Sequence, residues 1–324
     1  MSMFKKILVM CPGGAVTGGP EALHHLVHLL RGLGLDAYMV YTPEGKTFQT
    51  PEAYKGFNVK VGEYEDAPGN LIIFPEVEPM KALAVQHAKA AMWWLSLDNF
   101  LERRHVNRVR DFVRYWKGVI KGRRPRLGVV ALKDIIHFSQ SHYSGEYLAS
   151  KGIAFTNFFE PINERFLDPQ LDPGVSGRVD EILYNPSKGK KLTSQLIARY
   201  PQYKFTPLKG FSREDLSKKF ATAKIYIDFG HHPGRDRLPR EAAMHGCCVV
   251  TGQLGAAQNS VDIPIADSYK LDSFAPDFER QFGALVNDIF EHFEVHHARF
   301  ASYRARIMTE PQTFQSQIAA YFCP

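Results

Sequence analysis

Apolar positions in the first half of the chain fall into short continuous runs separated by amphipathic helical stretches. Runs at 5–10, 71–76 and 91–97 have the length and composition of buried strands. The stretch from Pro20 to Leu33 repeats leucine and valine at helical spacing. Buried strands that alternate with helices are typical of a parallel sheet covered by helices. The pattern therefore predicts the α/β class for this half.

The same rhythm returns in the second half. An apolar run at 225–227 ends in a loop rich in glycine, histidine, proline and arginine, and a helix begins near Leu238. A further apolar run at 249–250 follows the helix-ending Gly246. Helical spacing also runs without a break from 277 to 308. The loop after 227 should lie at the carboxyl end of a parallel strand, where such sheets bind ligands.

The composition of this loop indicates a nucleotide site. Arg235 and Arg237 precede a predicted helix N-terminus, and both guanidinium groups and free backbone N–H groups bind phosphate. Glu241 follows one turn into the helix, where a carboxylate suits ribose hydroxyls. His231 and His232 complete the set of side chains expected to face the ligand.

Chain length predicts two domains, because 324 residues exceed what one hydrophobic core usually organises. The segment from 159 to 177 is dense in proline, aspartate and glycine and has the composition of a linker. We assign a first domain to 1–165, a second to 166–307 and a terminal helix to 308–324.

The run from Leu238 to Val250 resembles the donor-site signature of nucleotide-sugar glycosyltransferases with two Rossmann-like domains, the GT-B fold. That signature has two glutamates separated by seven residues. Glu241 matches the second, which in the family binds the nucleotide ribose, whereas Pro233 stands in place of the first. The resemblance implies two Rossmann-like domains with an interdomain cleft, the second domain binding the donor, and a terminal helix that crosses back to the first.

Two further parts of the chain gain an interpretation from this resemblance. A lysine after the first strand of the donor domain would bind the diphosphate, and Lys188 is the candidate; a solvated lysine cluster is the alternative. The glycine-rich loop with Gly14, Gly18 and Gly19 matches neither the dinucleotide fingerprint nor the Walker loop, whose lysine position is Gly19. It would bring backbone close to donor or acceptor, or would merely turn the chain.

Carboxylates that follow the predicted strands are candidates for a general base. Asp98 comes after the run 91–97 and could take the proton of an acceptor hydroxyl. It could equally cap the following helix. Glu76, which ends the run 71–76, and Glu78, which follows it, are weaker candidates.

Charge and hydropathy place limits on partners and location. The net charge is +6, and the stretch 100–126 predicts an amphipathic helix with a cationic face, suited to anionic lipid or acidic polysaccharide, or simply to solvent. No nucleic-acid reader motif accompanies the charge. No signal peptide or membrane-length apolar run is present, and the four cysteines form no Cys-x-x-Cys pair. We expect a cytoplasmic protein, with peripheral contact at the inner membrane face as an additional expectation.

Together these observations predict a glycosyltransferase that moves a sugar from a nucleotide-sugar donor to a hydroxyl acceptor, a glycan or lipid-linked molecule, in surface glycan or polysaccharide synthesis. Arg235, Arg237 and Lys188 would neutralise the leaving diphosphate. Asp98 would act as the base. No Asp-x-Asp motif occurs, so we expect neither metal nor cofactor beyond the donor. The alternatives are a sugar-nucleotide epimerase of the same fold and a degenerate, non-catalytic binding protein.

Overall fold

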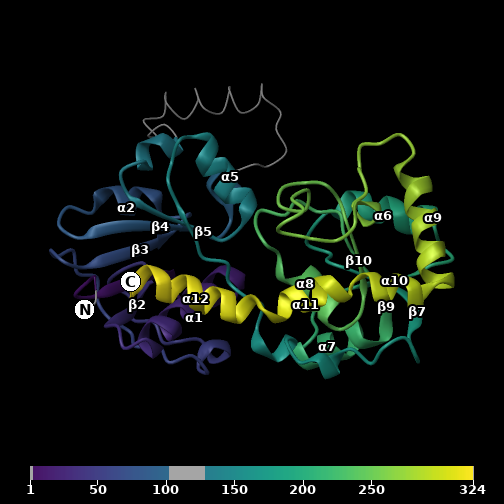
Figure 1. Ribbon diagram of the computed structural model, residues 1–324, viewed down its shortest axis with the longest axis horizontal. Helices are drawn as coiled ribbons and strands as arrows, with labels where there is room; N and C mark the ends of the chain where they lie inside the picture. The colour runs from purple at the N-terminus through teal and green to yellow at the C-terminus, as the bar shows by residue number, and fades with distance from the viewer. Residues whose placement is uncertain (1–2, 102–127, 324) are drawn as a thin grey trace. The chain divides into compact units, whose positions relative to one another are not determined.

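A computed structural model describes residues 3–101 and 128–323, which form two compact units (Figure 1). Unit 1 comprises Met1–Phe158 and Gln315–Pro324, and unit 2 comprises Phe159–Phe314. The sequence had placed the first boundary at 165, within the Pro-rich segment. The structural boundary comes earlier because the start of this segment, including Glu160, packs with unit 2.

Unit 1 is built on a six-stranded sheet in the order β2-β1-β3-β4-β5-β6, in which every neighbouring pair is parallel. The strands are β1 (Ile7–Pro12), β2 (Ala37–Thr42), β3 (Leu71–Pro75), β4 (Lys89–Trp94), β5 (Ile136–Ser139) and β6 (Thr156–Asn157). Its described helices are α1 (Gly18–Gly32), α2 (Pro79–Ala84), α3 (Leu97–Leu101) and α5 (His142–Ser150).

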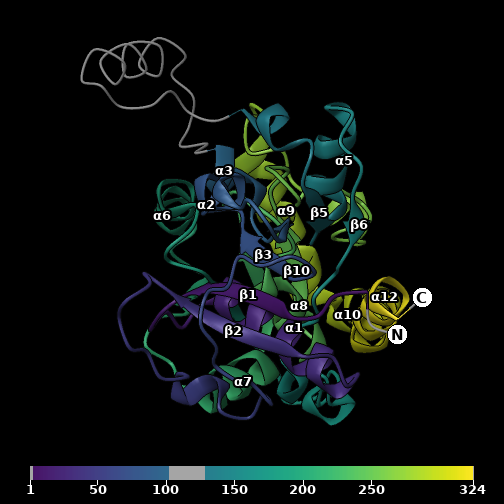
Figure 2. The ribbon, with the colours of Figure 1, turned by 90° about the vertical axis from the view of Figure 1, so that its left-hand side faces the viewer.

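The strand order of unit 1 decides where its ligand edge lies. From β1 the chain crosses through α1 to β2 on one side, and from β3 it steps through α2 to β4 on the other. Right-handed crossovers in opposite directions put helices on opposite faces, and α1 packs against β1 and β2 (Figure 2). The order reverses between β1 and β3. Ligands of such sheets bind beyond the carboxyl ends of the strands at this reversal.

The core of unit 1 contains two adjacent tryptophans at the end of β4. Trp93 and Trp94 are both fully buried, and each indole N–H has a hydrogen-bond acceptor. Trp94 donates to Nδ1 of His137 at 3.0 Å, and Trp93 donates to the carbonyl of Phe158 at 3.2 Å. The rings can therefore be buried on both faces of the sheet without leaving a polar atom unpaired.

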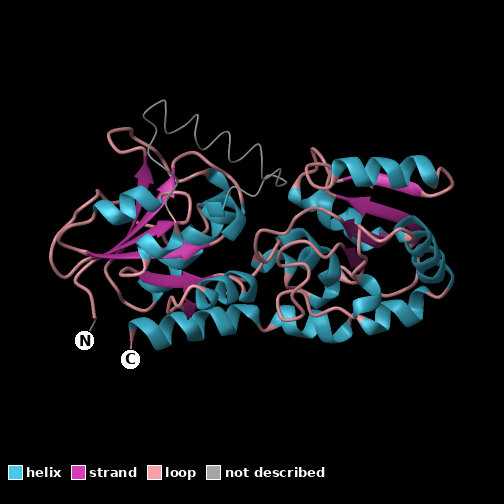
Figure 3. Ribbon diagram, turned by 90° about the horizontal axis from the view of Figure 1, so that it is seen from above, coloured by secondary structure: helices cyan, strands magenta, loops and turns pink. Residues whose placement is uncertain are grey.

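Unit 2 has a four-stranded parallel sheet in the order β10-β9-β7-β8. Figure 3 distinguishes its strands from the helices by colour. The strands are β7 (Val179–Tyr184), β8 (Lys204–Pro207), β9 (Ala223–Asp228) and β10 (Cys248–Thr251). The helices are α6 (Lys190–Arg199), α7 (Arg213–Thr222), α8 (Arg237–Met244), α9 (Phe278–Glu291), α10 (Phe293–Arg299) and α11 (Ala301–Met308). The last helix, α12 (Glu310–Phe322), is shared between the two units. The strand order reverses between β7 and β9, which defines the ligand edge of this unit.

The C-terminal part of the chain differs from the single helix predicted over 277–308. Breaks at His292 and Phe300 divide it into α9, α10 and α11. Phe293, the first residue of α10, and Phe300, which directly follows α10, are both buried in the core of unit 2, next to the two breaks. The final helix, α12, begins in unit 2, and its last residues belong to unit 1, where Phe322 packs edge-on to Phe4 at 6.2 Å.

Arg240 on α8 is the centre of a buried charge network in unit 2. Its guanidinium donates to Oε2 of Glu310 at 2.6 Å and to the carbonyl of Glu160 at 3.1 Å. It also donates to the carbonyls of Arg235 and Asp236, at 2.7 and 3.2 Å. One side chain thus connects the linker, the loop before α8 and the start of α12.

Replacing Arg240 with methionine should lower the free energy of unfolding by about 3 to 5 kcal/mol, because Glu160 and Glu310 would lose a buried positive partner. Urea denaturation measures this difference. The control is Lys218→Ala, which removes an exposed ion pair with Glu214 and should leave the urea midpoint unchanged. Equal midpoints for the parent and the Arg240 variant would contradict the structural role of this network.

Candidate functional site

Two glycines bring the ends of β7 and β9 into backbone contact at the ligand edge of unit 2. Gly189 has φ +57°, and a Cβ there would lie 2.9 Å from the backbone nitrogen of Gly230. A Cβ on Gly230 would lie 2.5 Å from Cβ of Lys188. Both contacts are too short for any larger residue. This close approach places Lys188 directly beside the loop that leaves β9.

Lys188 has a carboxylate partner at this edge. Its ammonium donates to Oδ2 of Asp236, the residue before α8. The two side chains are 27% and 21% exposed. The pair is therefore accessible enough for an anionic ligand to reach the ammonium.

Behind the lysine, the imidazole of His232 lies between two aspartates. Nδ1 is 3.2 Å from Oδ2 of Asp236, and Nε2 is 3.6 Å from Oδ1 of Asp228. His232 is fully buried, so the structure places it beneath the loop surface. Burial alone would lower its pKa, but the two carboxylates outweigh burial and raise the pKa above its ordinary value.

Asp228 is the negative end of this arrangement. Burial would raise its pKa, but His232, Lys188 and the N–H of Gly230 hold that pKa below its ordinary value. The Gly230 N–H donates to Oδ1 at 2.9 Å. At neutral pH the carboxylate is therefore ionised despite its burial.

Within the described residues, Asp228, His232 and Asp236 are also the group whose spacing could hold a metal ion, with one ligand atom from each lying within 4.8 Å of the others. The two imidazole nitrogens face different aspartates, and Lys188 already places a positive charge on Asp236. The arrangement thus resembles a bridged pair of carboxylates more closely than a set of ligands around one point.

A second loop, which follows β10, is bonded to the loop after β9. The N–H of His232 donates to the carbonyl of Leu254 at 3.2 Å, and the N–H of Ala256 donates to the carbonyl of His232 at 2.8 Å. Gly255 has φ +65°, and a Cβ there would lie 3.0 Å from the ring of His231. His231, which is half-buried, therefore rests against this second loop.

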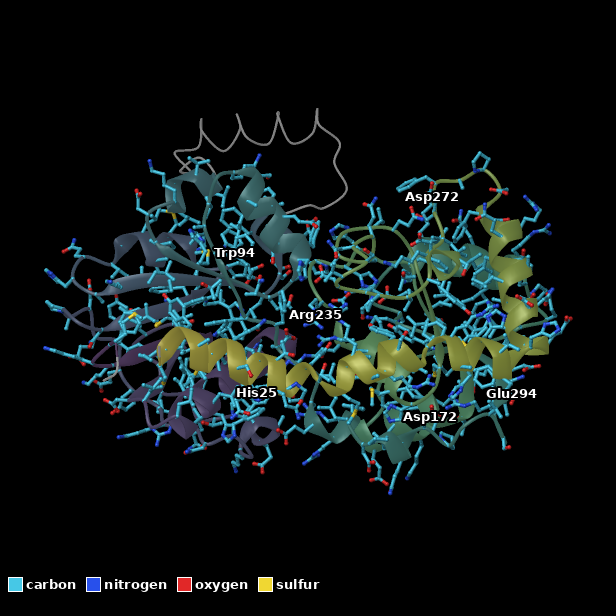
Figure 4. The ribbon with its side chains drawn as sticks, viewed as in Figure 1. His25, Trp94, Asp172, Arg235, Asp272 and Glu294 are labelled. Atoms are coloured by element: carbon cyan, nitrogen blue, oxygen red, sulfur yellow. The ribbon has the colours of Figure 1, made fainter. Side chains whose placement is uncertain are left out.

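The two arginines predicted to bind phosphate both lie beside carboxylates. Arg235 (Figure 4) donates to Oε1 of Glu310, and its guanidinium lies 5.5 Å from the ring centroid of Phe159. Nε of Arg237 is 3.7 Å from Oε1 of Glu160. A diphosphate would have to compete with these glutamates for either arginine.

Glu241 lies one turn into α8, as the sequence predicted, and is largely buried. Its carbonyl accepts a hydrogen bond from Nδ1 of His245 at 2.7 Å. The helix that carries it starts directly after Asp236, so Glu241 and the Lys188 pair belong to the same edge of the sheet.

In unit 1, the glycine-rich loop leaves β1 at the strand reversal. Gly14 turns the chain with φ +72°, and Gly18 and Gly19 begin α1. A Cβ on Gly13 would lie 2.5 Å from the ring of Phe48, so that aromatic ring covers the loop. The loop therefore brings backbone and a half-buried ring to the ligand edge.

Asp98 and Glu76 lie near the carboxyl ends of the central strands of unit 1. Asp98 is in the first turn of α3, and its Oδ1 accepts a hydrogen bond from the hydroxyl of Tyr143 at 3.2 Å. Glu76 follows β3 and accepts from the N–H of Leu95 at 3.2 Å and from Nδ2 of Asn99 at 3.3 Å. Burial raises the pKa of Glu76 to about 7.

Asp228 and Asp236, which the structure places on either side of His232, were not among the candidates named from the sequence. The sequence offers little to mark either aspartate as a site residue. Asp228 is the last residue of a strand, and Asp236 lies between two arginines that are themselves candidate phosphate ligands. Nothing in their spacing shows that both face His232.

Two further expectations concern a cationic surface helix and membrane spans. The cationic helix predicted for 100–126 falls, from residue 102 onward, outside the described residues. Among the helices of the described chain, none has the length and hydropathy needed to cross a membrane.

No protein-family model matches the chain, and no curated protein matches it. Solved structures match over nearly its whole length. HepE of Anabaena, solved with UDP, is 14% identical with a TM-score of 0.61, covering 98% of this chain and 99% of that one. Sucrose-phosphate synthase from Thermosynechococcus elongatus is 10% identical with a TM-score of 0.66, covering 98% of each chain.

A third match is the lipopolysaccharide outer core galactosyltransferase WaaB, 11% identical with a TM-score of 0.60, covering 98% of this chain and 100% of that one. These likenesses, together with the two parallel sheets, confirm the predicted fold class. The chain has the GT-B fold, with two Rossmann-like domains.

The raised pKa of Glu76 predicts a pH dependence of stability. Its folded pKa is about 7, above its ordinary 4.5, so its favourable contribution is complete below 4.5 and is lost as the pH rises toward 7. Glu76→Gln removes this titration. The difference in unfolding free energy between parent and variant should change by roughly 3 kcal/mol across that window. Parallel curves in urea titrations at pH 4.5 to 8 would rule out the raised pKa.

Proposed function

We propose that this protein is a glycosyltransferase that transfers a sugar from a nucleotide-sugar donor to a hydroxyl of a glycan or lipid-linked acceptor. The GT-B fold admits this function, and neighbours of the same fold were solved with UDP or UDP-glucose bound. The observation that carries the proposal is Lys188, a partly exposed cation fixed by two glycines at the strand reversal of unit 2.

The donor would bind along the loops of this edge. Glu241 would accept hydrogen bonds from the ribose hydroxyls, and Lys188 would contact the diphosphate. Arg235, Arg237, His231 and His232 remain further candidates; for Arg235 and His232, burial makes an indirect role through the loop the more consistent one. In unit 1, the loop with Gly14, Gly18 and Gly19 would approach the acceptor or the donor.

Transfer breaks the bond between the anomeric carbon and the diphosphate oxygen, which keeps the electron pair. A bond then forms between that carbon and the acceptor hydroxyl oxygen, whose proton passes to a base. Positive charge from Lys188 stabilises the negative charge that develops on the leaving group. Asp98 would accept the proton, with Tyr143 holding its carboxylate through the 3.2 Å hydrogen bond.

Three further elements of the proposal concern its setting: synthesis of surface glycan or polysaccharide, a cytoplasmic location with peripheral contact at an anionic membrane surface, and catalysis without a metal. The net charge of +6 and the cationic stretch 100–126 support the contact with an anionic surface, and the absence of an Asp-x-Asp motif in the sequence supports catalysis without a metal.

Product analysis with UDP-glucose and other nucleotide sugars tests the function. The purified protein should release nucleoside diphosphate and glycosylate a glycan or lipid-linked acceptor. Conversion of the donor sugar without an acceptor would instead identify an epimerase. Donor binding without any product would identify a non-catalytic binding protein.

Nucleotide affinity should depend on Glu241. A charge-assisted hydrogen bond contributes about 1.5 to 3 kcal/mol, so Glu241→Ala should weaken nucleoside diphosphate binding by roughly ten- to a hundredfold. Because the contact is with the ribose, the bare nucleoside should lose affinity equally. Calorimetric titration measures both ligands, and Glu214→Ala, on the exposed surface of α7, serves as the control. Unchanged affinity in a folded Glu241 variant would refute this donor site.

Turnover should depend on Asp98 if its carboxylate takes the acceptor proton. Asp98→Asn preserves the size of the side chain and its contact with Tyr143 but removes the proton acceptor. The kcat should fall by about a hundredfold or more, while donor affinity is retained. Turnover close to that of the parent would assign Asp98 to the packing of α3 instead.

A further inference from the structure

Lys188 has an anionic partner within the chain itself. Its ammonium lies on Oδ2 of Asp236, the same oxygen that faces Nδ1 of His232 at 3.2 Å. One carboxylate oxygen therefore lies beside both the ammonium of Lys188 and the imidazole of His232. A diphosphate that takes the lysine must compete with Asp236 for it.

We propose that Asp236 is a positioning residue, which holds Lys188 at the edge of the unit 2 sheet and releases it to the donor diphosphate while His232 continues to compensate the charge of Asp236. This inference rests on the proposed function. It adds Asp236 as the residue that determines whether Lys188 is available to the diphosphate.

The Lys188 side chain is partly exposed and can change partner, whereas the His232 side chain is buried and keeps its position. The Lys188 side chain is 27% exposed and flexible beyond Cβ, whereas the His232 side chain is 0% exposed. His232 is also fixed by backbone hydrogen bonds to Leu254 and Ala256 in the loop after β10. The lysine can therefore change partner without any movement of the imidazole.

Charge compensation explains why the exchange is feasible. Removing the only positive partner of a partly buried carboxylate is strongly unfavourable. When Lys188 leaves, Asp236 still faces the imidazole, whose second nitrogen faces Asp228. The charged groups around His232 are Asp228 from β9, Asp236 before α8 and Lys188 after β7, and the loop after β10 adds backbone contacts.

The exchange also gives a basis for selectivity. A ligand must carry enough negative charge to replace a carboxylate before it gains the lysine. A nucleoside diphosphate meets this condition, whereas a nucleoside does not. Asp236 therefore lowers the affinity for diphosphates in general and leaves the affinity for the base and ribose unchanged.

Calorimetric titration of Asp236→Asn with UDP and with uridine tests this inference. Asparagine keeps the size of the side chain but removes the competing charge. UDP should bind about three- to fivefold more tightly than to the parent, as expected for loss of a partly exposed competing ion pair. Uridine should bind with unchanged affinity. A residue with a merely structural role would weaken both ligands, so tighter UDP binding separates the two explanations.

The part played by His232 is tested by a double-mutant cycle. His232→Asn should weaken UDP binding in the parent, because Asp236 would then hold Lys188 more firmly. It should have no effect on UDP binding in the Asp236→Asn background. Thermal melts identify variants that fold, and the Asp236→Asn comparison decides the proposal even if the His232 variants do not fold.

Other outcomes separate this inference from the proposed function. If Lys188→Ala leaves UDP affinity unchanged, the donor site itself is wrong. If Lys188→Ala weakens UDP binding but Asp236→Asn does not tighten it, only the role of Asp236 is overturned. If chelation abolishes UDP binding to the parent and Mn²⁺ restores it, the aspartates bind a metal ion and the exchange is refuted.

Discussion

The candidate donor site depends on the hydrogen bonds that the buried guanidinium of Arg240 makes. An arginine can donate in several fixed directions at once, and here its N–H groups bind two backbone carbonyls of the loop before α8 and the carboxylate of Glu310. The loop therefore has a fixed path even though it contains two glycines and a proline. Asp236, which pairs with Lys188, takes its position from the carbonyl that Arg240 binds.

This dependence separates two kinds of cationic side chain at this edge of the sheet. Arg240 and Arg235 both bind Glu310 and are almost fully buried, so their charges support the fold. Lys188 is partly exposed and bound to a carboxylate that has a second partner. Of these three cations, the lysine can be transferred to a ligand at the lowest cost in unpaired buried charge.

Strand order accounts for the location of both candidate sites. In each unit the sheet reverses its order beside the first strand, and a glycine-containing loop lies at the reversal. In unit 2 this brings Gly189 and Gly230 together. In unit 1 the reversal lies between β1 and β3. The turn at Gly14 follows β1, and Glu76 follows β3. Each unit therefore has a glycine-containing loop at its strand reversal, although the other residues of the two loops differ.

The sequence by itself determined the α/β class, the repeated strand and helix pattern and the loop that carries the candidate donor-site residues. These are local properties, because the spacing of apolar residues along the chain indicates buried strands and amphipathic helices. The position of Glu241, one turn into α8, could be predicted for the same reason. Lys188 was named as a candidate from the sequence, through the resemblance of its loop to a known family, and the structure places it beside the loop after β9.

Only the tertiary structure decided which charges are paired. Arg235 and Glu310 are 75 residues apart, and Lys188 and Asp236 are 48 apart, so no local pattern could join them. The same holds for the raised pKa of Glu76, which burial causes and which no spacing of residues reveals. Burial and ion pairing depend on what the rest of the chain packs around a residue, and for that reason the roles of single charged residues were the least predictable part of the site.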